Sequence, residues 1–404
     1  MREIFVFGIS ALFAVGALIF LGLSGWFCLE AIAALLPMRS RLNSTSQPKS
    51  VAVLVPAHNE EVCLLETLAN LQTELKSLEH KARLVVVADN CTDSTATLAR
   101  NGGAIVVERH DLTQVGKGYA IDYGLRYLEP DTPDIVVLVD ADCQVEAGAI
   151  AKLIDCVIAS GRPAQATYLM TMPTTPSAKD AVSVFAFTVK NLVRPLGLLQ
   201  LGLPCLLTGT GMAFPWSVLR SVDLASGHLV EDMKLSLDLT ISGYAPIYCP
   251  EARVTGRLPQ HDRAARSQRT RWEHGHLQSI LTYVPALIKA AVQKDRPEAL
   301  ALALELSVPP MALFVMLWLA LWTVSLGWGW ISGVWSAAIL ATAAGVCLIV
   351  GVVSAWAKFG QADLSLSQLL SIPLYILWKI PLYFRFLVRP QQAWVRTERD
   401  ASPE

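Results

Sequence analysis

Long apolar runs stand at both ends of the chain. Residues 4–29 contain no charged side chain, and residues 306–326 and 334–357 form two further apolar runs. About 20 apolar residues are enough for a helix to cross a bilayer, so these three runs predict membrane-spanning helices. The first run is longer than the apolar core of ~7–15 residues found in a cleaved signal peptide, and no clean small-x-small site follows it. An uncleaved helix is therefore favoured over a signal peptide.

A fourth apolar stretch, residues 365–388, differs from the other three. It carries Lys379, Arg385 and two prolines within its length. A charged side chain near the centre of a bilayer is costly, so we expect an interfacial or re-entrant element at this place. The alternative is a third membrane span in the C-terminal region.

The middle of the chain has a different pattern. Short runs rich in β-branched residues alternate with stretches of helical periodicity. This alternation predicts an α/β domain with a mainly parallel sheet that is covered on both faces. Ligands bind such sheets at the carboxyl ends of the strands. The predicted strands are residues 51–56, 83–89, 104–108 and 134–140, and the predicted helices are residues 61–75, 93–101 and 117–128.

Polar side chains gather where three of these strands end. His58 and Glu60 follow the first strand, Asp89 ends the second, and Asp140 and Asp142 end the fourth. Carboxylates at one edge of a sheet repel each other unless a cation or a donor-rich ligand neutralises them. Two aspartates that are two residues apart can reach one hard ion, such as Mg²⁺ or Mn²⁺. The alternative for such a pair is a solvated turn.

Three further places carry candidate chemistry. Lys117 lies between two glycines at the start of a predicted helix, which suits a phosphate group, although a surface turn is the alternative. Gly209 interrupts a buried apolar run, which predicts a close approach of the backbone to a ligand or another strand. Glu231 and Asp232 are adjacent, and the residues after them fit both a strand and a helix. A purely structural acid at a helix start is the alternative for Asp232.

Composition and charge narrow the possible classes of protein. The chain has 404 residues, a net charge of −1 and no basic tract, so nothing indicates nucleic-acid binding. Its eight cysteines are scattered without C-x-x-C pairs, which indicates reduced cytosolic thiols rather than a zinc site or a disulfide framework. Only Arg2 precedes the first apolar run, whereas Arg39, Arg41 and Lys49 follow it. Because basic residues favour the cytosolic side of a membrane, we expect the middle domain in the cytosol.

A concentrated polar stretch, SQRTRWEHGH at residues 267–276, precedes the C-terminal apolar runs. On a helix, Gln268, Arg271 and Trp272 occupy positions i, i+3 and i+4 and share one face. We expect this face to carry the chemistry of the stretch. The other polar side chains are expected elsewhere, with Arg269 in solvent or at lipid head groups and His274 and His276 as structural or solvent-facing residues.

Together these motifs resemble the signature of the membrane-embedded branch of the family-2 glycosyltransferases, which includes the cellulose, chitin and hyaluronan synthases. That branch carries an Asp, a D-x-D, an E-D and a Q-x-x-R-W motif in this order. The resemblance implies a GT-A-type α/β domain flanked by transmembrane helices. The matching positions, all within residues 51–276, are Asp89, Asp140 with Asp142, Glu231 with Asp232, and Gln268, Arg271 and Trp272.

The resemblance also implies a role for each candidate residue. Asp232 is expected to act as the general base that takes the proton of the acceptor hydroxyl. On the donor side, the resemblance places His58, Glu60 and Asp89 around the nucleotide base, with Lys117 nearby. Asp140 is expected to contact the nucleotide and the metal, and Asp142 to bind a Mg²⁺ or Mn²⁺ ion. Gln268 and Arg271 are expected to bind the diphosphate. On the acceptor side, it places Trp272, Gly209 and Glu231.

The activity implied by the resemblance is an inverting hexosyl transfer. A UDP-sugar donates the sugar to a growing polysaccharide at the cytosolic face of a membrane, which we expect to be a bacterial inner membrane. One alternative is the transfer of a single sugar to a lipid or lipid-linked acceptor, and a more remote one is a non-catalytic nucleotide-binding membrane protein. The expected organisation is a transmembrane helix in residues 1–41, a cytosolic GT-A domain with interfacial helices in 42–290, a membrane region in 291–390 and a cytosolic tail in 391–404.

Overall fold

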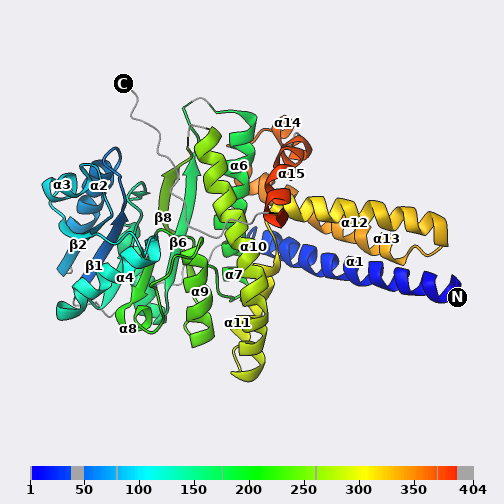
Figure 1. Ribbon diagram of the computed structural model, residues 1–404, viewed down its shortest axis with the longest axis horizontal. Helices are drawn as coiled ribbons and strands as arrows, with labels where there is room; N and C mark the ends of the chain where they lie inside the picture. The colour runs from blue at the N-terminus through cyan, green and yellow to red at the C-terminus, as the bar shows by residue number, and fades with distance from the viewer. Residues whose placement is uncertain are drawn as a thin grey trace.

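The computed structural model shows two parts of the molecule. Figure 1 shows an α/β part and a slender bundle of helices that projects from it, with the N-terminus at the far end of the bundle. The structure describes residues 2–37, 50–78, 81–174, 176–259, 262–370 and 372–388. The basic residues Arg39, Arg41 and Lys49 and the predicted tail 391–404 lie outside the described residues.

One sheet forms the centre of the α/β part. Its strands among the described residues are β1 (Ser50–Ala57), β2 (Lys81–Asp89), β3 (Ile105–Arg109), β4 (Ile135–Leu138), β5 (Gln144–Val145), β6 (Ala164–Thr171), β7 (Met212–Pro215) and β8 (Ile247–Arg257). Their order in space is β3-β2-β1-β4-β7-β6-β8-β5. The half from β3 to β4 is parallel, as the sequence predicts. Beyond it, β7 runs antiparallel to β4 and β6, so the whole sheet is mixed.

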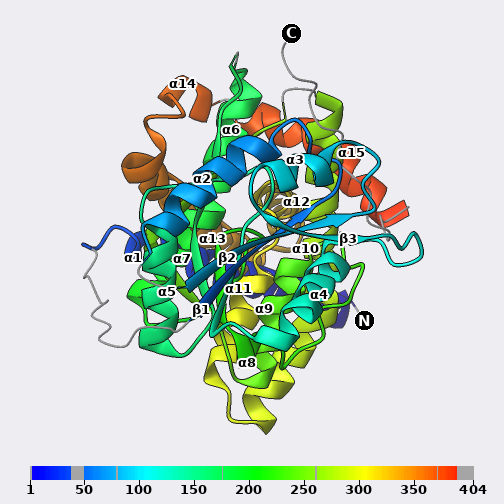
Figure 2. The ribbon, with the colours of Figure 1, turned by 90° about the vertical axis from the view of Figure 1, so that its left-hand side faces the viewer.

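Helices cover both faces of the sheet (Figure 2). One face carries α2 (Leu64–Lys76), α3 (Thr95–Asn101) and α5 (Ala149–Ser160). The other face carries α4 (Lys117–Leu128), α8 (Trp216–Leu219) and α9 (Glu231–Ser242). The short helix η1 (Glu129–Asp131) directly follows α4. Val53 of β1 packs in the first core with Leu68, and its neighbour Leu54 packs in the second with Leu125. Successive side chains of a strand point to opposite faces, so burial on both sides explains the continuous apolar runs.

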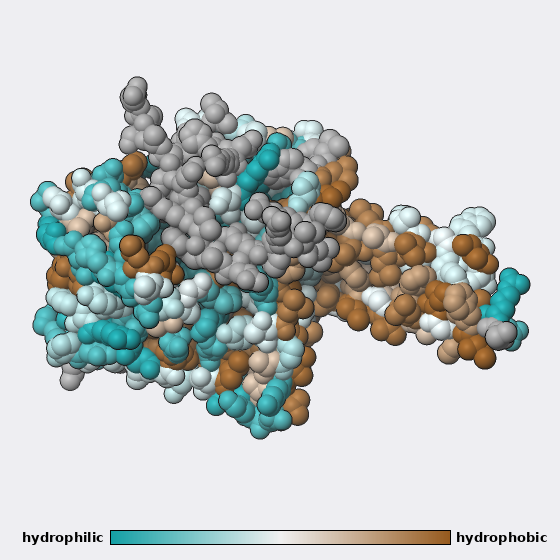
Figure 3. Space-filling model, in the orientation of Figure 1, coloured by the Kyte–Doolittle hydropathy of each residue, from teal (hydrophilic) through white to brown (hydrophobic). Residues whose placement is uncertain are grey.

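Three long helices form the projecting bundle: α1 (Arg2–Ala33), α12 (Met311–Ser332) and α13 (Ser336–Ala355). Hydrophobic residues cover most of their visible surface, with hydrophilic residues at the far tip (Figure 3). Ile4, Phe7 and Ile339 are among its exposed side chains. Each of the three helices is long and apolar enough to cross a membrane, the last of them with its extension η3 (Trp356–Gly360). Such a surface avoids water, which agrees with the predicted membrane spans.

A fourth helix among the described residues, spanning Ala178–Gln200, is also long and apolar enough to cross a membrane. It was not among the spans predicted from the sequence. It consists of α6 (Ala178–Thr188), the π-helical turn η2 (Val189–Val193) and α7 (Arg194–Gln200). Its most apolar window is 67% buried within the protein, compared with 11% for α1. This helix therefore lies in the interior, between the sheet and the bundle.

The remaining helices join the two parts of the molecule. They are α10 (Asp262–Gln293), α11 (Pro297–Ser307), α14 (Leu366–Leu369) and α15 (Ile372–Val388). At this junction the buried guanidinium of Arg194 forms ion pairs with Glu30 of α1, at 2.8 Å, and with Glu305 of α11. A buried ion pair is costly to break, because removal of one partner leaves the other charge without compensation. Arg194 thus ties the bundle to the α/β part.

Candidate active site

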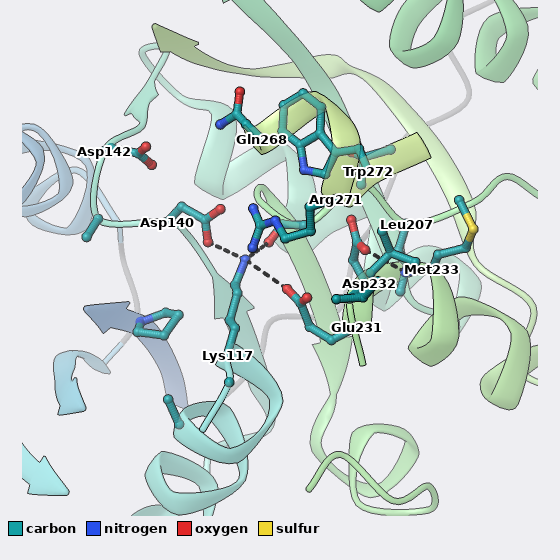
Figure 4. A pocket seen from close by; sticks show the side chains of 18 of the residues that line it. Lys117, Asp140, Asp142, Leu207, Glu231, Asp232, Met233, Gln268, Arg271 and Trp272 are labelled. Atoms are coloured by element: carbon teal, nitrogen blue, oxygen red, sulfur yellow. Dashed lines mark hydrogen bonds and ion pairs between the residues drawn. The ribbon is translucent and has the colours of Figure 1, made fainter. Parts of the chain in front are cut away.

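A cavity of about 230 Å³ opens at the carboxyl ends of β1, β2 and β4. The parallel half of the sheet supplies one wall, and the N-terminal ends of α4 and α9 and one face of α10 supply the others (Figure 4). The structure brings every residue of the predicted site to this cavity. These residues are His58, Glu60, Asp89, Lys117, Asp140, Asp142, Gly209, Glu231, Asp232, Gln268, Arg271 and Trp272.

Lys117 lies at the centre of the cavity (Figure 4). Its ammonium group forms an ion pair with Asp140, lies 3.6 Å from the carboxylate of Glu231 and donates a hydrogen bond of 2.7 Å to the carbonyl of Gly209. Burial alone would lower the pKa of Lys117, but the neighbouring carboxylates, Asp140 first among them, outweigh burial and raise that pKa above its usual value. Lys117 is therefore a fixed positive charge rather than the solvated lysine of a surface turn.

Gly209 makes this arrangement possible. Its φ angle is +95°, a conformation that side chains with a β-carbon rarely adopt. A β-carbon at this position would lie 3.2 Å from Oδ2 of Asp232 and 3.7 Å from Nζ of Lys117. The close backbone approach predicted from the sequence is therefore an approach to two side chains of the cavity.

The two aspartates after β4 lie in a turn beside Cys143. Ligand atoms of Asp140, Asp142 and Cys143 all lie within 4.8 Å of one another. The backbone N–H of Asp140 donates a hydrogen bond of 3.0 Å to the hydroxyl of Thr210, which fixes the start of the turn. Burial raises the pKa of the Cys143 thiol well above its usual value. Sulfur is also a softer ligand than the oxygens that a hard cation prefers. The two carboxylates remain as the oxygen ligands for a hard cation.

Asp89 is held by a partner outside the predicted set of site residues. Arg109, at the end of β3, lies opposite Asp89 in the register of the sheet, and its Nη1 is 2.7 Å from Oδ1 of Asp89. Burial raises the pKa of Asp89, although the guanidinium of Arg109 opposes this shift. The backbone carbonyl of Asp89 lies 2.6 Å from Nδ1 of His58, which joins the ends of β1 and β2. Asp89 thus contacts Arg109 through its side chain and His58 through its backbone, which connects the ends of β1, β2 and β3.

Glu231 and Asp232 begin α9, so the helical alternative is the one that the protein adopts. Oδ1 of Asp232 accepts a hydrogen bond of 2.8 Å from the backbone N–H of Met233. Burial raises the pKa of Glu231 against the opposing effect of Lys117. The N-terminal position also lets the Asp232 side chain interact favourably with the helix dipole. The aspartate therefore has a structural contact and also faces the cavity.

The polar stretch of residues 267–276 is helical, within α10. Gln268, Arg271 and Trp272 line the cavity from one face of this helix, as the spacing predicts (Figure 4). The indole of Trp272 packs against the ring of Phe187, with 5.9 Å between the ring centroids. The tryptophan is therefore positioned by α6 and is fixed at the edge of the cavity.

The other polar residues of this stretch hold the junction together. His274 and His276 are buried, with Nε2 atoms 3.2 Å and 3.0 Å from the backbone carbonyls of Leu382 and Leu306, which agrees with the predicted structural role. Arg269 points away from the cavity, but the prediction of a solvated or lipid-facing side chain is wrong. Its guanidinium donates a hydrogen bond of 2.8 Å to the hydroxyl of Ser183, because α6 packs against α10.

Two more residues of the cavity, Lys190 and Asn191, were not among the predicted site residues. Both lie in the π-helical turn η2 of the buried helix. A signal for them was present, because a lysine and an asparagine interrupt an otherwise apolar run at this point. A polar side chain in a buried apolar run is costly unless it has a partner, so its presence indicates a site.

Comparisons with known proteins place this geometry in a family. Residues 48–275, more than half of the chain, match the family described as Glycosyltransferase like family 2. The chain belongs to this family. It is therefore a glycosyltransferase, as the motifs predict.

Individual relatives agree with this assignment. The glycosyltransferase is 30% identical over 263 residues to the uncharacterized glycosyltransferase YaiP of Escherichia coli, and the match covers 61% of each chain. It is 32% identical over 108 residues to the low-salt glycan biosynthesis hexosyltransferase Agl6 of Haloferax volcanii, which covers 27% of this chain and 24% of that protein. The chain thus matches less than two thirds of the length of either relative.

A solved structure shows the same fold. The mannosyltransferase PcManGT of Pyrobaculum calidifontis, solved in complex with GDP-Man and Mn²⁺, superimposes with a TM-score of 0.55 and 18% sequence identity. The similarity covers 87% of this glycosyltransferase and 98% of that chain. The predicted GT-A-type fold with flanking apolar helices is therefore confirmed.

Proposed function

We propose that this glycosyltransferase moves a hexose from a nucleotide sugar to an acceptor hydroxyl, with inversion at the anomeric carbon. The observation that carries the proposal is that groups suited to a metal-bound diphosphate and groups suited to an acceptor hydroxyl lie on different sides of one cavity. Asp140 and Asp142 lie on one side of Lys117, and Glu231 and Asp232 lie on the other (Figure 4). A diphosphate and an acceptor hydroxyl can thus be bound at the same time, on opposite sides of one sugar.

The reaction needs a base for the acceptor and positive charge for the leaving group. Asp232 takes the proton of the acceptor hydroxyl as its oxygen forms a bond to the anomeric carbon. The bond from that carbon to the diphosphate breaks, and the electron pair leaves with the nucleoside diphosphate. Lys117 and Arg271 stabilise the charge that develops on the diphosphate, and Gln268 donates a further hydrogen bond.

The donor set after β4 fits a divalent cation. Asp140 and Asp142 supply carboxylate oxygens, which Mg²⁺ and Mn²⁺ prefer to the soft sulfur of Cys143. When bound, the cation neutralises the diphosphate and polarises its bond to the sugar. The presence of Mn²⁺ in the PcManGT complex supports the same choice of ion for this chain.

We infer that the donor is a UDP-sugar. The end of the cavity formed by β1 and β2 offers His58, Glu60 and Asp89 for the nucleotide base and ribose. Glu60 and Asp89 are buried at this end, and carboxylate oxygens can accept hydrogen bonds from the N–H and O–H groups of a nucleoside. Trp272 offers an apolar face to the acceptor sugar, with Gly209 and Glu231 beside it.

Two classes of acceptor follow from the proposal. The motif order favours a growing polysaccharide at the cytosolic side of a bacterial inner membrane, with the α/β part in residues 42–290 facing the cytosol. A single transfer to a membrane lipid is the second candidate. It is supported by a large, mostly apolar cavity beside the active site.

The test uses purified protein in detergent, a panel of UDP- and GDP-sugars, and Mg²⁺ or Mn²⁺. The release of nucleoside diphosphate is expected with at least one donor and is expected to fall by about 10²–10⁴-fold in Asp232→Asn. Asp238→Asn, on the same helix but paired with Lys234 outside the cavity, is the matched control and should retain activity. No release with any donor, or full activity of Asp232→Asn, contradicts the proposal. Sizing of the product then separates polymer from single addition.

A further inference from the structure

A second cavity, of about 240 Å³, lies beside the candidate active site. Most of its wall is apolar, and α6, α10, α12 and α15 all contribute to it, with Phe185, Val315 and Ile376 as examples. The two cavities share part of their walls and are therefore neighbours. The side chains that line both of them are Phe187, Lys190, Thr208, Gln268 and Trp272.

The bundle helices bring this second cavity to the membrane-facing side of the molecule. Phe27 of α1, Val315 of α12 and Val352 of α13 all contribute to its wall. The same helices carry the largely apolar surface seen in Figure 3. An apolar cavity offers water few hydrogen bonds, whereas a hydrocarbon chain gains about 25 cal/mol for each Å² of apolar surface that it buries. The wall therefore matches the chain of a membrane lipid.

Two of the cationic side chains in the wall of the second cavity form ion pairs. Arg194 is paired with Glu305, and Lys379 is paired with Glu273. Lys190 forms neither an ion pair nor a hydrogen bond with any part of the chain that the structure describes. Its side chain is exposed and lines both cavities, at the boundary between the second cavity and the candidate active site. A lysine side chain at this boundary can bind an anion of a ligand.

Two neutral oxygens at the same boundary also lack partners within the described ranges. Asn191 is 3% exposed and lines the candidate active site, and its buried Oδ1 accepts no hydrogen bond from the described residues. The hydroxyl of Thr208, which lines both cavities, is equally unsatisfied. A buried polar group without a partner costs about 1–3 kcal/mol, which a ligand hydroxyl recovers when it donates to the oxygen. The π-helical turn places Lys190 and Asn191 side by side, and such turns are frequent at functional sites.

We propose that the acceptor is a membrane lipid whose head group combines a phosphate ester with free hydroxyls, an inference that rests on the proposed glycosyl transfer. Lys190 pairs with the phosphate, and Asn191 and Thr208 bind hydroxyls of the head group. The hydrocarbon chain occupies the second cavity. A further hydroxyl of the head reaches Asp232, loses its proton to that carboxylate and forms the new bond to the sugar as the nucleoside diphosphate leaves.

The experiment uses the full chain in nanodiscs of phosphatidylcholine. A phosphatidylglycerol that carries a photoactivatable diazirine in one acyl chain serves as the probe, because its head has both a phosphate ester and free hydroxyls. Peptides from α6, α12 and α15 are expected to carry the label. Unlabelled phosphatidylglycerol should compete about tenfold better than diacylglycerol, which lacks the phosphate, and better than phosphatidylethanol, which lacks the head hydroxyls.

Matched variants test the two parts of the site separately. Lys190→Gln should remove the advantage of phosphatidylglycerol over diacylglycerol, whereas Lys289→Gln, an exposed lysine of α10, should keep it. Val315→Phe narrows the second cavity and should reduce labelling by all lipids. Val324→Phe, on the exposed side of the same helix, should not. Equal competition by all three lipids, or unchanged labelling in both Lys190→Gln and Val315→Phe, overturns the inference.

The same preparations separate this inference from the proposed function. Nucleoside diphosphate release from the sugar donor is measured beside the labelling. Release without selective labelling overturns the lipid assignment alone and returns the acceptor to a polysaccharide. Selective labelling without release from any donor overturns the proposed transfer instead.

Discussion

The side-chain oxygen Oδ2 of Asp232 lies 3.2 Å from the place that a β-carbon would occupy on Gly209. The glycine, at the end of a loop from the middle of the chain, therefore sets the space available to the proposed base at the start of α9. The same glycine accepts the hydrogen bond from Lys117 through its carbonyl. One backbone position thus controls the placement of two functional groups.

Gly209→Ala should therefore reduce activity strongly. The added methyl group displaces the Asp232 carboxylate, and the positive φ angle adds strain of about 1–2 kcal/mol. We expect nucleoside diphosphate release to fall by at least about tenfold, since a small misplacement of reacting groups is costly. Gly161→Ala is the control, because Gly161 also has a positive φ angle but opens onto free space. Equal activity of the two variants would contradict this role for Gly209.

Lys117→Met should weaken the binding of the donor. The substitution leaves the carboxylates of Asp140 and Glu231 without their shared cation, and it removes a positive charge from the diphosphate site. We expect the Kd for UDP to rise by at least about tenfold and the protein to lose about 1–3 kcal/mol of stability. Calorimetric titration with UDP and thermal unfolding measure the two effects. Lys76→Met, an exposed lysine at the end of α2, should change neither.

The metal requirement should depend on Asp142 and not on Cys143. Asp142→Asn removes a charged oxygen ligand, so the concentration of Mn²⁺ needed for half-maximal activity should rise by about tenfold or more. Cys143→Ala should leave that concentration unchanged, because the thiol is buried and sulfur is a soft ligand that a hard cation does not prefer. Activity titrated with Mn²⁺ after treatment with a chelator gives both values. A large shift in Cys143→Ala would show that the thiol is a ligand.

Acid should destabilise the protein through His276. Burial lowers the pKa of His276 to about 3, whereas the same group in an unfolded chain has a pKa of about 6.5. Between these two pH values, His276 therefore binds a proton in the unfolded state but not in the folded state. The free energy of unfolding should fall as the pH falls below about 6.5, by up to about 1.4 kcal/mol for each pH unit.

The substitution His276→Gln tests whether this histidine causes the pH dependence of the free energy of unfolding. The side-chain amide of His276→Gln can still donate to the carbonyl of Leu306, but it does not titrate. Thermal unfolding between pH 7 and pH 5 should therefore depend less steeply on pH in this variant. His110→Gln, which replaces an exposed histidine, should keep the slope of the parent protein. Parallel curves for all three proteins would rule out His276 as the cause.

Much of this molecule is determined by local sequence patterns. Short β-branched runs specify strands, and long uncharged runs specify the bundle helices, because burial or lipid on all sides demands apolar residues. Parallel strands end at one edge of a sheet, so Asp89, Asp140 and Asp142 meet without further information. The i, i+3, i+4 spacing likewise brings Gln268 and its two partners to one face of α10.

Only the tertiary structure decides which distant elements meet. Residues 178–200 are apolar enough to resemble a membrane span, but packing against both the sheet and the bundle makes them an interior helix that delivers Lys190 and Asn191 to the site. The pairing of Arg109 with Asp89 depends on the register between β2 and β3. These contacts join segments whose spacing along the chain carries no periodic signal, because packing selects them by shape and charge after the elements have formed.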